Sequence, residues 1–293
     1  MFPIPAFLIP FADNIKLSVS YDLLKLGAGS LLKHIVPEKN KPSPDTPDDL
    51  PHHIPRLCTE QEHPGVDGDS AEVYGFSLLD YCMEHQNVVL LGEAGCGKTQ
   101  ELQRIEVCCY KDANLPRAVR IPLRTYSDES MAQLARQHGV EPEEQENLFF
   151  LIDGFDEIAG VHKQNFLKQA ALYQQENKDA RFLISTRNHF YREGLFGEAF
   201  QAVWMQPLTE SEIERYVTEI GISYENWKQQ MEAKQLSTVV ENPFYLVELC
   251  QIYQECGEIP ERDRLMQTLT ERKLRQDLEK YRMTGKMDFE ENI

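Results

Sequence analysis

The chain has few positive charges for its length. It carries 30 lysines and arginines against 48 aspartates and glutamates, a formal net charge of −18 over 293 residues. A surface with this balance repels polyphosphate backbones and anionic lipid, so no general nucleic-acid binding is expected. Long hydrophobic runs are also lacking. None approaches the ~20 residues of a membrane-spanning helix, and no membrane span is predicted.

The seven cysteines form no C-x-x-C pair. Their scatter and odd number favour neither a disulfide framework nor a zinc site. Reduced thiols are typical of the cytoplasm, which predicts a cytoplasmic location. The apolar N-terminus, Met1–Pro10, lacks a basic segment and contains three prolines. It is therefore a poor signal peptide, and a packed arm is favoured over a membrane-touching segment.

Changes in composition divide the chain into four parts. Residues 1–36 predict a short helical N-terminal segment, and the proline-rich residues 37–70 predict a linker or an extended segment crossing the domain surface. In residues 71–206, apolar strand candidates alternate with helical stretches, which predicts an α/β fold with a parallel sheet covered on both faces. Residues 207–293 predict a small all-α lid domain. The strand candidates are 88–91, 118–123, 148–153, 181–185 and 202–205.

Helix signals support this division. Before the first strand candidate, residues 77–83 have a helical pattern, and residues 163–173 form another helix candidate between strands. Thr209 and Glu212 predict a capping box at the start of the first lid helix. Pro243 predicts the start of a second helix through Tyr253. A last, highly charged helix is predicted over 262–281.

One glycine-rich loop is the strongest functional signal. The apolar run 88–91 leads directly into G-x-x-x-x-G-K-T at Gly92–Thr99, and a helical stretch follows, which is the context of a phosphate-binding P-loop. Its glycines let backbone N–H groups point inward, and the helix N-terminus favours an anion. Lys98 supplies a charge for the terminal phosphates, and Thr99 a hydroxyl for Mg²⁺. The alternative is a glycine-rich turn that fits by chance. The predicted nucleotide-contacting residues are Gly92, Glu93, Ala94, Gly95, Cys96, Gly97, Lys98, Thr99 and Gln100.

Carboxylates after a second strand candidate would complete such a site. Asp153 ends the apolar run 148–152, where ligands bind in open α/β sheets, and is predicted to be the Mg²⁺-linked acid. Glu157 would orient or deprotonate a water, or else is a solvated acid. Asp156 would support the metal shell or make a structural hydrogen bond. Arg187, after another strand candidate, would contact the γ-phosphate.

The base is predicted to be adenine. The stretch Asn177-Lys178-Asp179 is followed by Ala180, so the spacing of a guanine-reading N-K-x-D box fails. ATP or ADP with Mg²⁺ is therefore the expected ligand.

In this order, the motifs resemble those of the NACHT family, within the STAND branch of P-loop NTPases. The glycine-rich loop is followed by an apolar run with D-G-F-D-E, a sensor strand, a lid opening and an N-P-F-Y-L segment. The resemblance covers roughly residues 71–281. Its motifs stand at Gly92–Thr99, Phe149–Glu157, Leu183–Arg187, Gln206–Tyr216 and Asn242–Leu246.

The resemblance implies a slow ATPase that works as a switch. ADP would hold a closed monomer, and an unknown trigger ligand or protein would open it. ATP would then drive self-association into an oligomer, in immunity or antiphage-type defence. Pro243 would pack against the adenine. The family continues into a winged-helix domain about where the printed sequence ends, so we expect either a fragment or a minimal member.

Two other functions stay open. One is a nucleotide-binding scaffold or regulatory module with negligible hydrolysis. The other is an AAA+-like remodelling ATPase, against which the D-G-F-D-E and N-P-F-Y-L forms argue.

Overall fold

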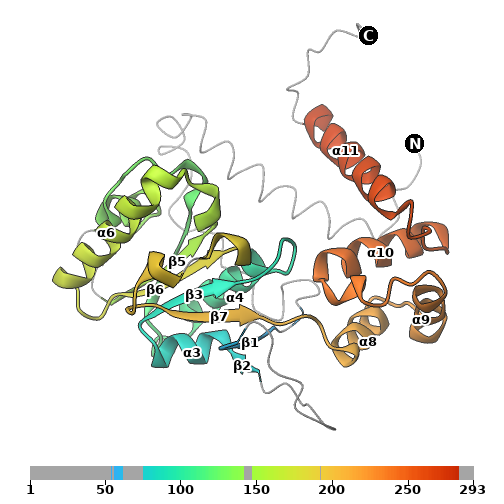
Figure 1. The fold of residues 1–293 in the computed structure, drawn as a ribbon, viewed down its shortest axis with the longest axis horizontal. Coiled ribbons are helices and arrows are strands. Elements are labelled where there is room, and N and C mark those ends of the chain that lie inside the picture. The colour runs from blue at the N-terminus through green and yellow to red at the C-terminus, as the bar shows by residue number, and fades with distance from the viewer. Residues whose placement is uncertain (1–53, 55, 62–74, 142–146, 192, 284–293) are drawn as a thin grey trace, which may run out of the picture. The chain divides into compact units, whose positions relative to one another are not determined.

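The computed structural model describes residues 54, 56–61, 75–141, 147–191 and 193–283 (Figure 1). The predicted N-terminal helical segment, 1–36, and most of the predicted linker, 37–70, lie outside these residues. Among the described helices, none combines the length and the apolar character that a membrane crossing requires.

A seven-stranded, mostly parallel sheet forms the first part of the described fold. Its strand order is β2-β1-β7-β3-β6-β5-β4. The five strands from β7 to β4 run parallel to their neighbours, while β1 pairs antiparallel with both β7 and β2. The strands are β1 Leu57–Thr59, β2 Phe76–Ser77, β3 Asn87–Leu91, β4 Arg117–Pro122, β5 Leu148–Asp153, β6 Arg181–Thr186 and β7 Gln201–Met205.

The predicted α/β class with a largely parallel sheet is confirmed at this level. All five predicted strands are present, with ends that differ by one residue or less. The strands β1 and β2 were not predicted, because they have three and two residues and leave no periodic pattern.

Helices cover both faces of the sheet. On one face, buried residues of α3 and α4 join alternate strand residues, such as Val88 and Leu90, in one apolar cluster. On the other face, α5, α6 and α7 pack on the intervening residues, such as Val89 and Leu91. Burial of both faces explains why the strands read as continuous apolar runs. These helices are α3 Leu78–Glu84, α4 Lys98–Lys111, α5 Met131–Gln137, α6 Gly160–Glu176 and α7 Glu193–Phe196.

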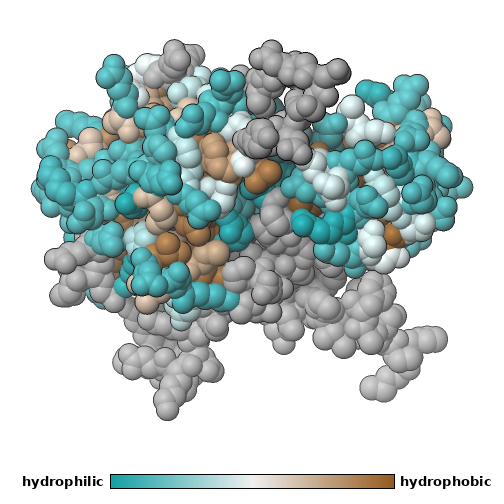
Figure 2. Space-filling view, turned by 90° about the horizontal axis from the view of Figure 1, so that it is seen from below, coloured by the Kyte–Doolittle hydropathy of each residue, from teal (hydrophilic) through white to brown (hydrophobic). Residues whose placement is uncertain are grey.

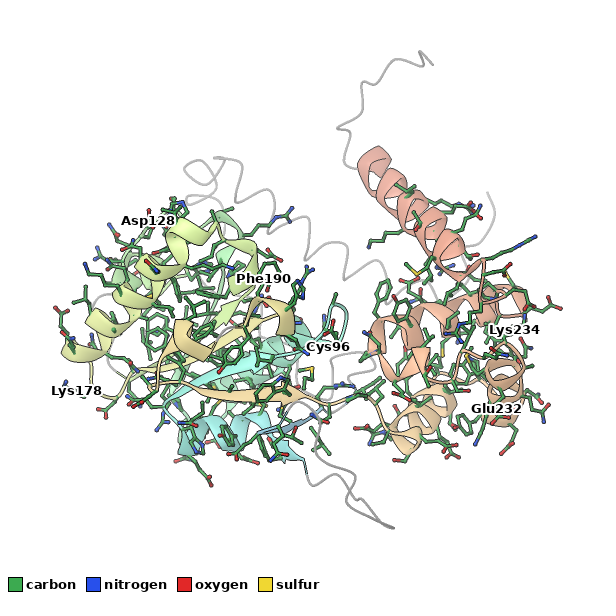
Figure 3. All side chains as sticks on the ribbon, viewed as in Figure 1. Cys96, Asp128, Lys178, Phe190, Glu232 and Lys234 are labelled. Carbon is green, nitrogen blue, oxygen red and sulfur yellow. The ribbon has the colours of Figure 1, made fainter. Side chains whose placement is uncertain are left out.

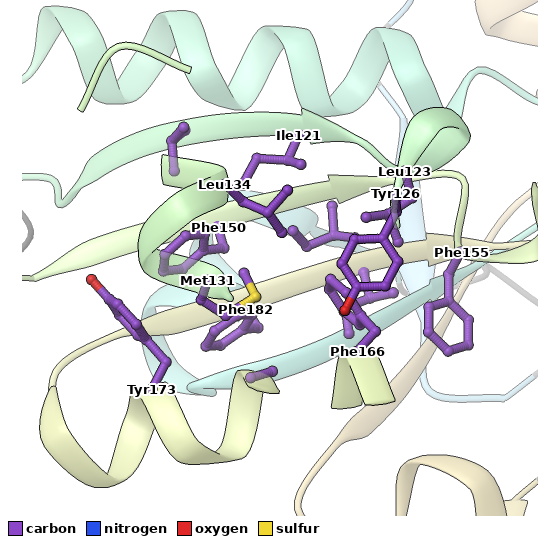
Figure 4. Packing of buried hydrophobic residues seen from close by; sticks show 14 of the residues in the cluster. Ile121, Leu123, Tyr126, Met131, Leu134, Phe150, Phe155, Phe166, Tyr173 and Phe182 are labelled. Atoms are coloured by element: carbon purple, nitrogen blue, oxygen red, sulfur yellow. The ribbon is translucent and has the colours of Figure 1, made fainter. Parts of the chain in front are cut away.

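Aromatic rings fill much of the core beneath α5 and α6 (Figure 4). Phe150 stacks on Phe182 with ring centroids 4.8 Å apart and meets Tyr173 edge-on at 5.1 Å. Offset-stacked and edge-to-face pairs of this kind add to the free energy gained from burial alone. The packing fixes the strands that end at the site described below.

Residues 207–283, the helical region, follow the sheet and have an apolar cluster of their own. The predicted capping box is present: Thr209 and Glu212 bond each other's backbone at the start of α8. Pro243 is the first residue of α10, as predicted, and Gly257 ends it at φ 72°, where glycine is favoured. The helices are α8 Glu210–Glu219, α9 Tyr224–Ala233, α10 Pro243–Cys256 and α11 Leu265–Met283.

Four single 3₁₀ turns lie between these elements: η3 Leu123–Thr125, η5 Phe155–Glu157, η6 Asn188–Phe190 and η7 Val239–Glu241. Hydrophilic residues cover most of the coloured face in Figure 2, and hydrophobic ones show in limited areas between them. That distribution fits the strongly negative, charge-rich composition.

Candidate functional site

The carboxyl ends of the parallel strands meet at one edge of the sheet. There the chain leaves β3 through α4, on one face, and leaves β6 towards α7, on the other. Because β3 and β6 are neighbours, these opposite exits make this edge a topological switch point of the sheet. Ligands of open α/β sheets bind at such points. The predicted site residues that follow β3, β5 and β6 are therefore at this edge.

The glycine-rich loop Gly92–Thr99 joins β3 to α4. Gly95 and Gly97 adopt φ angles of 78° and 98°, in the left-handed region that favours glycine. At Gly95 a Cβ atom would also lie 2.7 Å from Cβ of Phe244 on α10. Cys96, labelled in Figure 3, is buried, as is Gly92. The backbone thus has the compact form in which only glycine fits at two positions.

Lys98 is the first residue of α4. Its ammonium donates to the carbonyl oxygens of Gly92 and Glu93 at 2.7 and 2.9 Å, and lies 3.8 Å from the Cys96 sulfur. The positive charge is held at the mouth of the loop by the loop's own backbone. An anion bound there would meet this charge together with the N-terminus of a 14-residue helix.

Thr99, in the helix that follows β3, and Asp153, at the end of β5, are brought together although their strands are not neighbours. The Thr99 hydroxyl donates to Oδ1 of Asp153 at 3.2 Å, although β6 lies between β3 and β5. The hydroxyl of Ser185, on β6, donates to the same oxygen at 2.9 Å and accepts the Gly154 N–H at 3.0 Å. Ser185 therefore orients Asp153 from the intervening strand.

The sequence analysis did not predict a role for Ser185. A serine just before the end of an apolar strand is the sequence signal that would have indicated it, and in the structure this side chain is 1% exposed. A buried hydroxyl is expected to have a hydrogen-bond partner, and the nearest polar group at that edge is the predicted acid.

Asp156 and Arg187 form an ion pair. Nε of Arg187 lies 3.0 Å from Oδ2 of Asp156, whose side chain is 6% exposed, whereas that of Arg187 is 44% exposed. The pair fixes the loop after β6 to the turn after β5. Asp156 thus makes a structural contact, and Arg187 is held at the site's edge. Glu157, one residue on, is exposed to solvent.

The start of α10 contacts the glycine-rich loop. Nδ2 of Asn242 donates to the carbonyl oxygen of Ala94 at 2.9 Å, and the N–H of Phe244 donates to that of Gly95 at 3.3 Å. Oδ1 of Asn242 also accepts the Phe244 N–H and caps the helix. Pro243, half-buried between them, is therefore beside the loop. Asn242 was not among the predicted site residues.

Gln100, also among the predicted contacts, follows Thr99 on α4 and is exposed. In the described residues, no group of three or more histidine, cysteine, aspartate or glutamate side chains is placed to hold a metal ion. An ion at this edge would have Thr99 and Asp153 as its protein oxygen ligands.

No family model matches the chain, and no curated protein matches its sequence.

Proposed function

We propose that this chain is an ATP- and ADP-binding P-loop NTPase that acts as a signal-transduction switch. The carrying observation is the contact of the Thr99 hydroxyl with Asp153 at 3.2 Å. It joins the residue after the loop lysine to the acid of a separate buried strand. A glycine-rich turn that fits the motif by chance gives no reason for this pairing.

The donor set fits a magnesium nucleotide. Mg²⁺ takes oxygen ligands, keeps several waters and is bound through one or two carboxylates together with substrate phosphates. The Thr99 hydroxyl and the Asp153 carboxylate, the latter oriented by Ser185, match that preference. When bound, the ion would neutralise charge on the phosphates.

The chain's own residues would do the remaining work. Lys98 would exchange at least one of its loop carbonyls for a phosphate oxygen, since all three of its donors now face loop atoms. The loop amides and the first turn of α4 would hold the anion. Glu157 is the exposed last residue of η5, the turn that Gly154 caps. It is the candidate to position a water for slow hydrolysis.

The contact between α10 and the loop supports a switch. A ligand moves a two-state equilibrium only through its different contacts in the two states. The carbonyl oxygens of Ala94 and Gly95 each accept a hydrogen bond from the start of α10, so a change in the loop on nucleotide binding changes these bonds directly. In the proposed switch, ATP binding leads to self-association after an unknown trigger. Its place in immunity or antiphage-type defence rests on the resemblance to NACHT proteins.

A nucleotide-binding regulatory module with negligible hydrolysis is the second candidate. It is favoured by the Arg187–Asp156 ion pair, which keeps both side chains engaged with each other rather than with a phosphate. The two functions differ in turnover and agree on binding.

ATP binding tests what the two functions share, and phosphate release then distinguishes them. Lys98→Ala is expected to abolish ATP binding in a calorimetric titration, because it removes the loop's cation. Lys111→Ala, at the exposed far end of the same helix, is the matched control and should bind normally. Retained affinity in Lys98→Ala would refute the site. Phosphate release by the wild type that is lost in Glu157→Gln supports the ATPase, and no release by the wild type supports the regulatory module.

A further inference from the structure

A short segment that ends in β1 contacts both the rest of the sheet and the helical region. We call the described residues Ile54 and Arg56–Thr59 the strap. Cys58 is fully buried in the apolar cluster beneath α3 and α4, and pairs with Met205 of β7. Four residues earlier, Ile54 belongs to the apolar cluster of the helical region. The strap is therefore anchored by apolar contacts in both parts of the chain.

The strap also holds the residue at which the chain leaves the sheet. Gln206 directly follows β7, and its N–H donates to the carbonyl oxygen of Leu57 at 3.0 Å. Its side-chain nitrogen donates to the Thr59 hydroxyl at 2.6 Å, and its carbonyl oxygen accepts from Nη2 of Arg56. The helical region cannot turn about Gln206 without breaking these bonds or carrying the strap along.

Arg56 lies among charges from both parts. Its side chain is only 7% exposed. Burial lowers the pKa of this guanidinium, while nearby Glu212 of α8 and Glu101 of α4 act in the opposite direction. Glu101 is 1% exposed and lies in the first turn after the glycine-rich loop. The field of these two acids thus offsets part of the cost of burying the cation.

The hydrogen bonding of Arg56 is incomplete in this arrangement. Among the described residues, its Nε and Nη1 atoms have no hydrogen-bond partner. Buried donors without partners are unfavourable, and native structures rarely keep them without a reason. An arrangement that paired these two donors would therefore be more favourable for Arg56 than this one.

We propose that the strap couples nucleotide binding to the helical region. Arg56 is the positioning residue that holds Gln206, and Cys58 joins the strap to α4 through the apolar cluster that they share. This inference rests on the proposed nucleotide-driven switch. Arg56 acts through the junction after β7, so its loss should uncouple the helical region while leaving the loop able to bind.

Hydrogen exchange of the full chain without nucleotide tests whether the strap restrains the helical region through Gln206. Arg56→Met should speed amide exchange in α8 about tenfold, because a charge-assisted hydrogen bond to the junction is lost. Arg104→Met is the matched control: Arg104 also pairs with Glu101, at 2.6 Å, but belongs to α4 itself. It should leave α8 exchange unchanged. Equal α8 exchange in the wild type and Arg56→Met would overturn the proposal.

A second variant covers the case in which Arg56→Met does not fold, as judged by circular dichroism. Thr59→Val removes one bond to Gln206, together with the hydroxyl's own bond to the Gln61 carbonyl oxygen within the same segment, and keeps the strand residue β-branched. It should speed α8 exchange about threefold. Unchanged amide exchange in α8 would then contradict the proposed role of the strap.

The same measurement with saturating Mg²⁺-ATP tests the coupling. We expect ATP to change α8 exchange in the wild type, and we expect Arg56→Met to bind ATP within about threefold of the wild type but to lose that change. An equal ATP-induced change in both would overturn the coupling. If the wild type binds no ATP, the proposed function fails, while the nucleotide-free comparison still decides whether the strap holds the helical region.

Discussion

Ser185 and Thr186, adjacent on β6, provide a sharp test of the site. Both are almost fully buried, at 1% and 0% exposed. Ser185 donates to Asp153 at 2.9 Å and accepts from Gly154 at 3.0 Å. The hydroxyl of Thr186 has no hydrogen-bond partner in the described part of the chain. Removal of the two hydroxyls should therefore have opposite consequences.

For Ser185→Ala, the loss follows from two hydrogen bonds. A hydrogen bond to a charged group contributes about 1.5–3 kcal/mol, and the Gly154 N–H loses its acceptor as well. We expect the free energy of unfolding to fall by about 2–3 kcal/mol. For Thr186→Val, loss of an unpartnered buried hydroxyl should be neutral within about 0.5 kcal/mol or stabilising. Urea unfolding of both variants measures the difference.

The same two variants also distinguish a role of Ser185 in metal binding from a role in stability alone. Residues that orient a metal ligand typically change metal affinity by about 10–100-fold when removed. Ser185→Ala should therefore weaken ATP binding about tenfold with Mg²⁺ and hardly at all with EDTA, as read by calorimetry. Thr186→Val should leave both affinities unchanged. Equal behaviour of the two variants in unfolding and in binding would refute the reasoning.

The remaining predictions address the loop, the metal ligand and the thiols. Gly95→Ala should cost more than the ~1–2 kcal/mol of a left-handed alanine, because its Cβ would also meet Phe244; urea unfolding measures it. Asp153→Ala should weaken Mg²⁺-ATP more than ATP in EDTA, and equal losses would count against its metal role. Burial raises the pKa of Cys250 to about 12. At pH 8 a thiol reagent should therefore modify exposed Cys256 first and Cys250 only on unfolding, as peptide mapping would show.

The buried strands could be predicted from sequence because their local signal is strong. The apolar run of β5 ends in Asp153, and both ends agree with the prediction. β1 carries no such signal, since it has three residues in a proline-rich stretch. Its place is fixed by pairing with β7, and a contact between segments so far apart along the chain leaves no local periodicity.

The same distinction applies to the site. The loop and Asp153 were predictable, because the spacing of the motif determines the backbone and the end of a buried strand determines the edge. The Arg187–Asp156 pair and the role of Ser185 depend on how the neighbouring strands β5 and β6 align at their ends. An arginine after a strand is compatible with contact to a phosphate or to an acid, and only the tertiary arrangement selects between them.

The contacts between α10 and the loop limit how strong the proposed switch can be. Two backbone carbonyls of the loop accept hydrogen bonds, one from Asn242 and one from Phe244. At about 0.5–1.5 kcal/mol each, these bonds can transmit about 1–3 kcal/mol between the loop and the helical region. That range matches a coupling of about 5–150-fold in affinity, and linkage makes it reciprocal. In the proposed switch, nucleotide binding changes the equilibrium for movement of α10 away from the loop by a certain factor. Movement of α10 away from the loop must then change the affinity for nucleotide by the same factor.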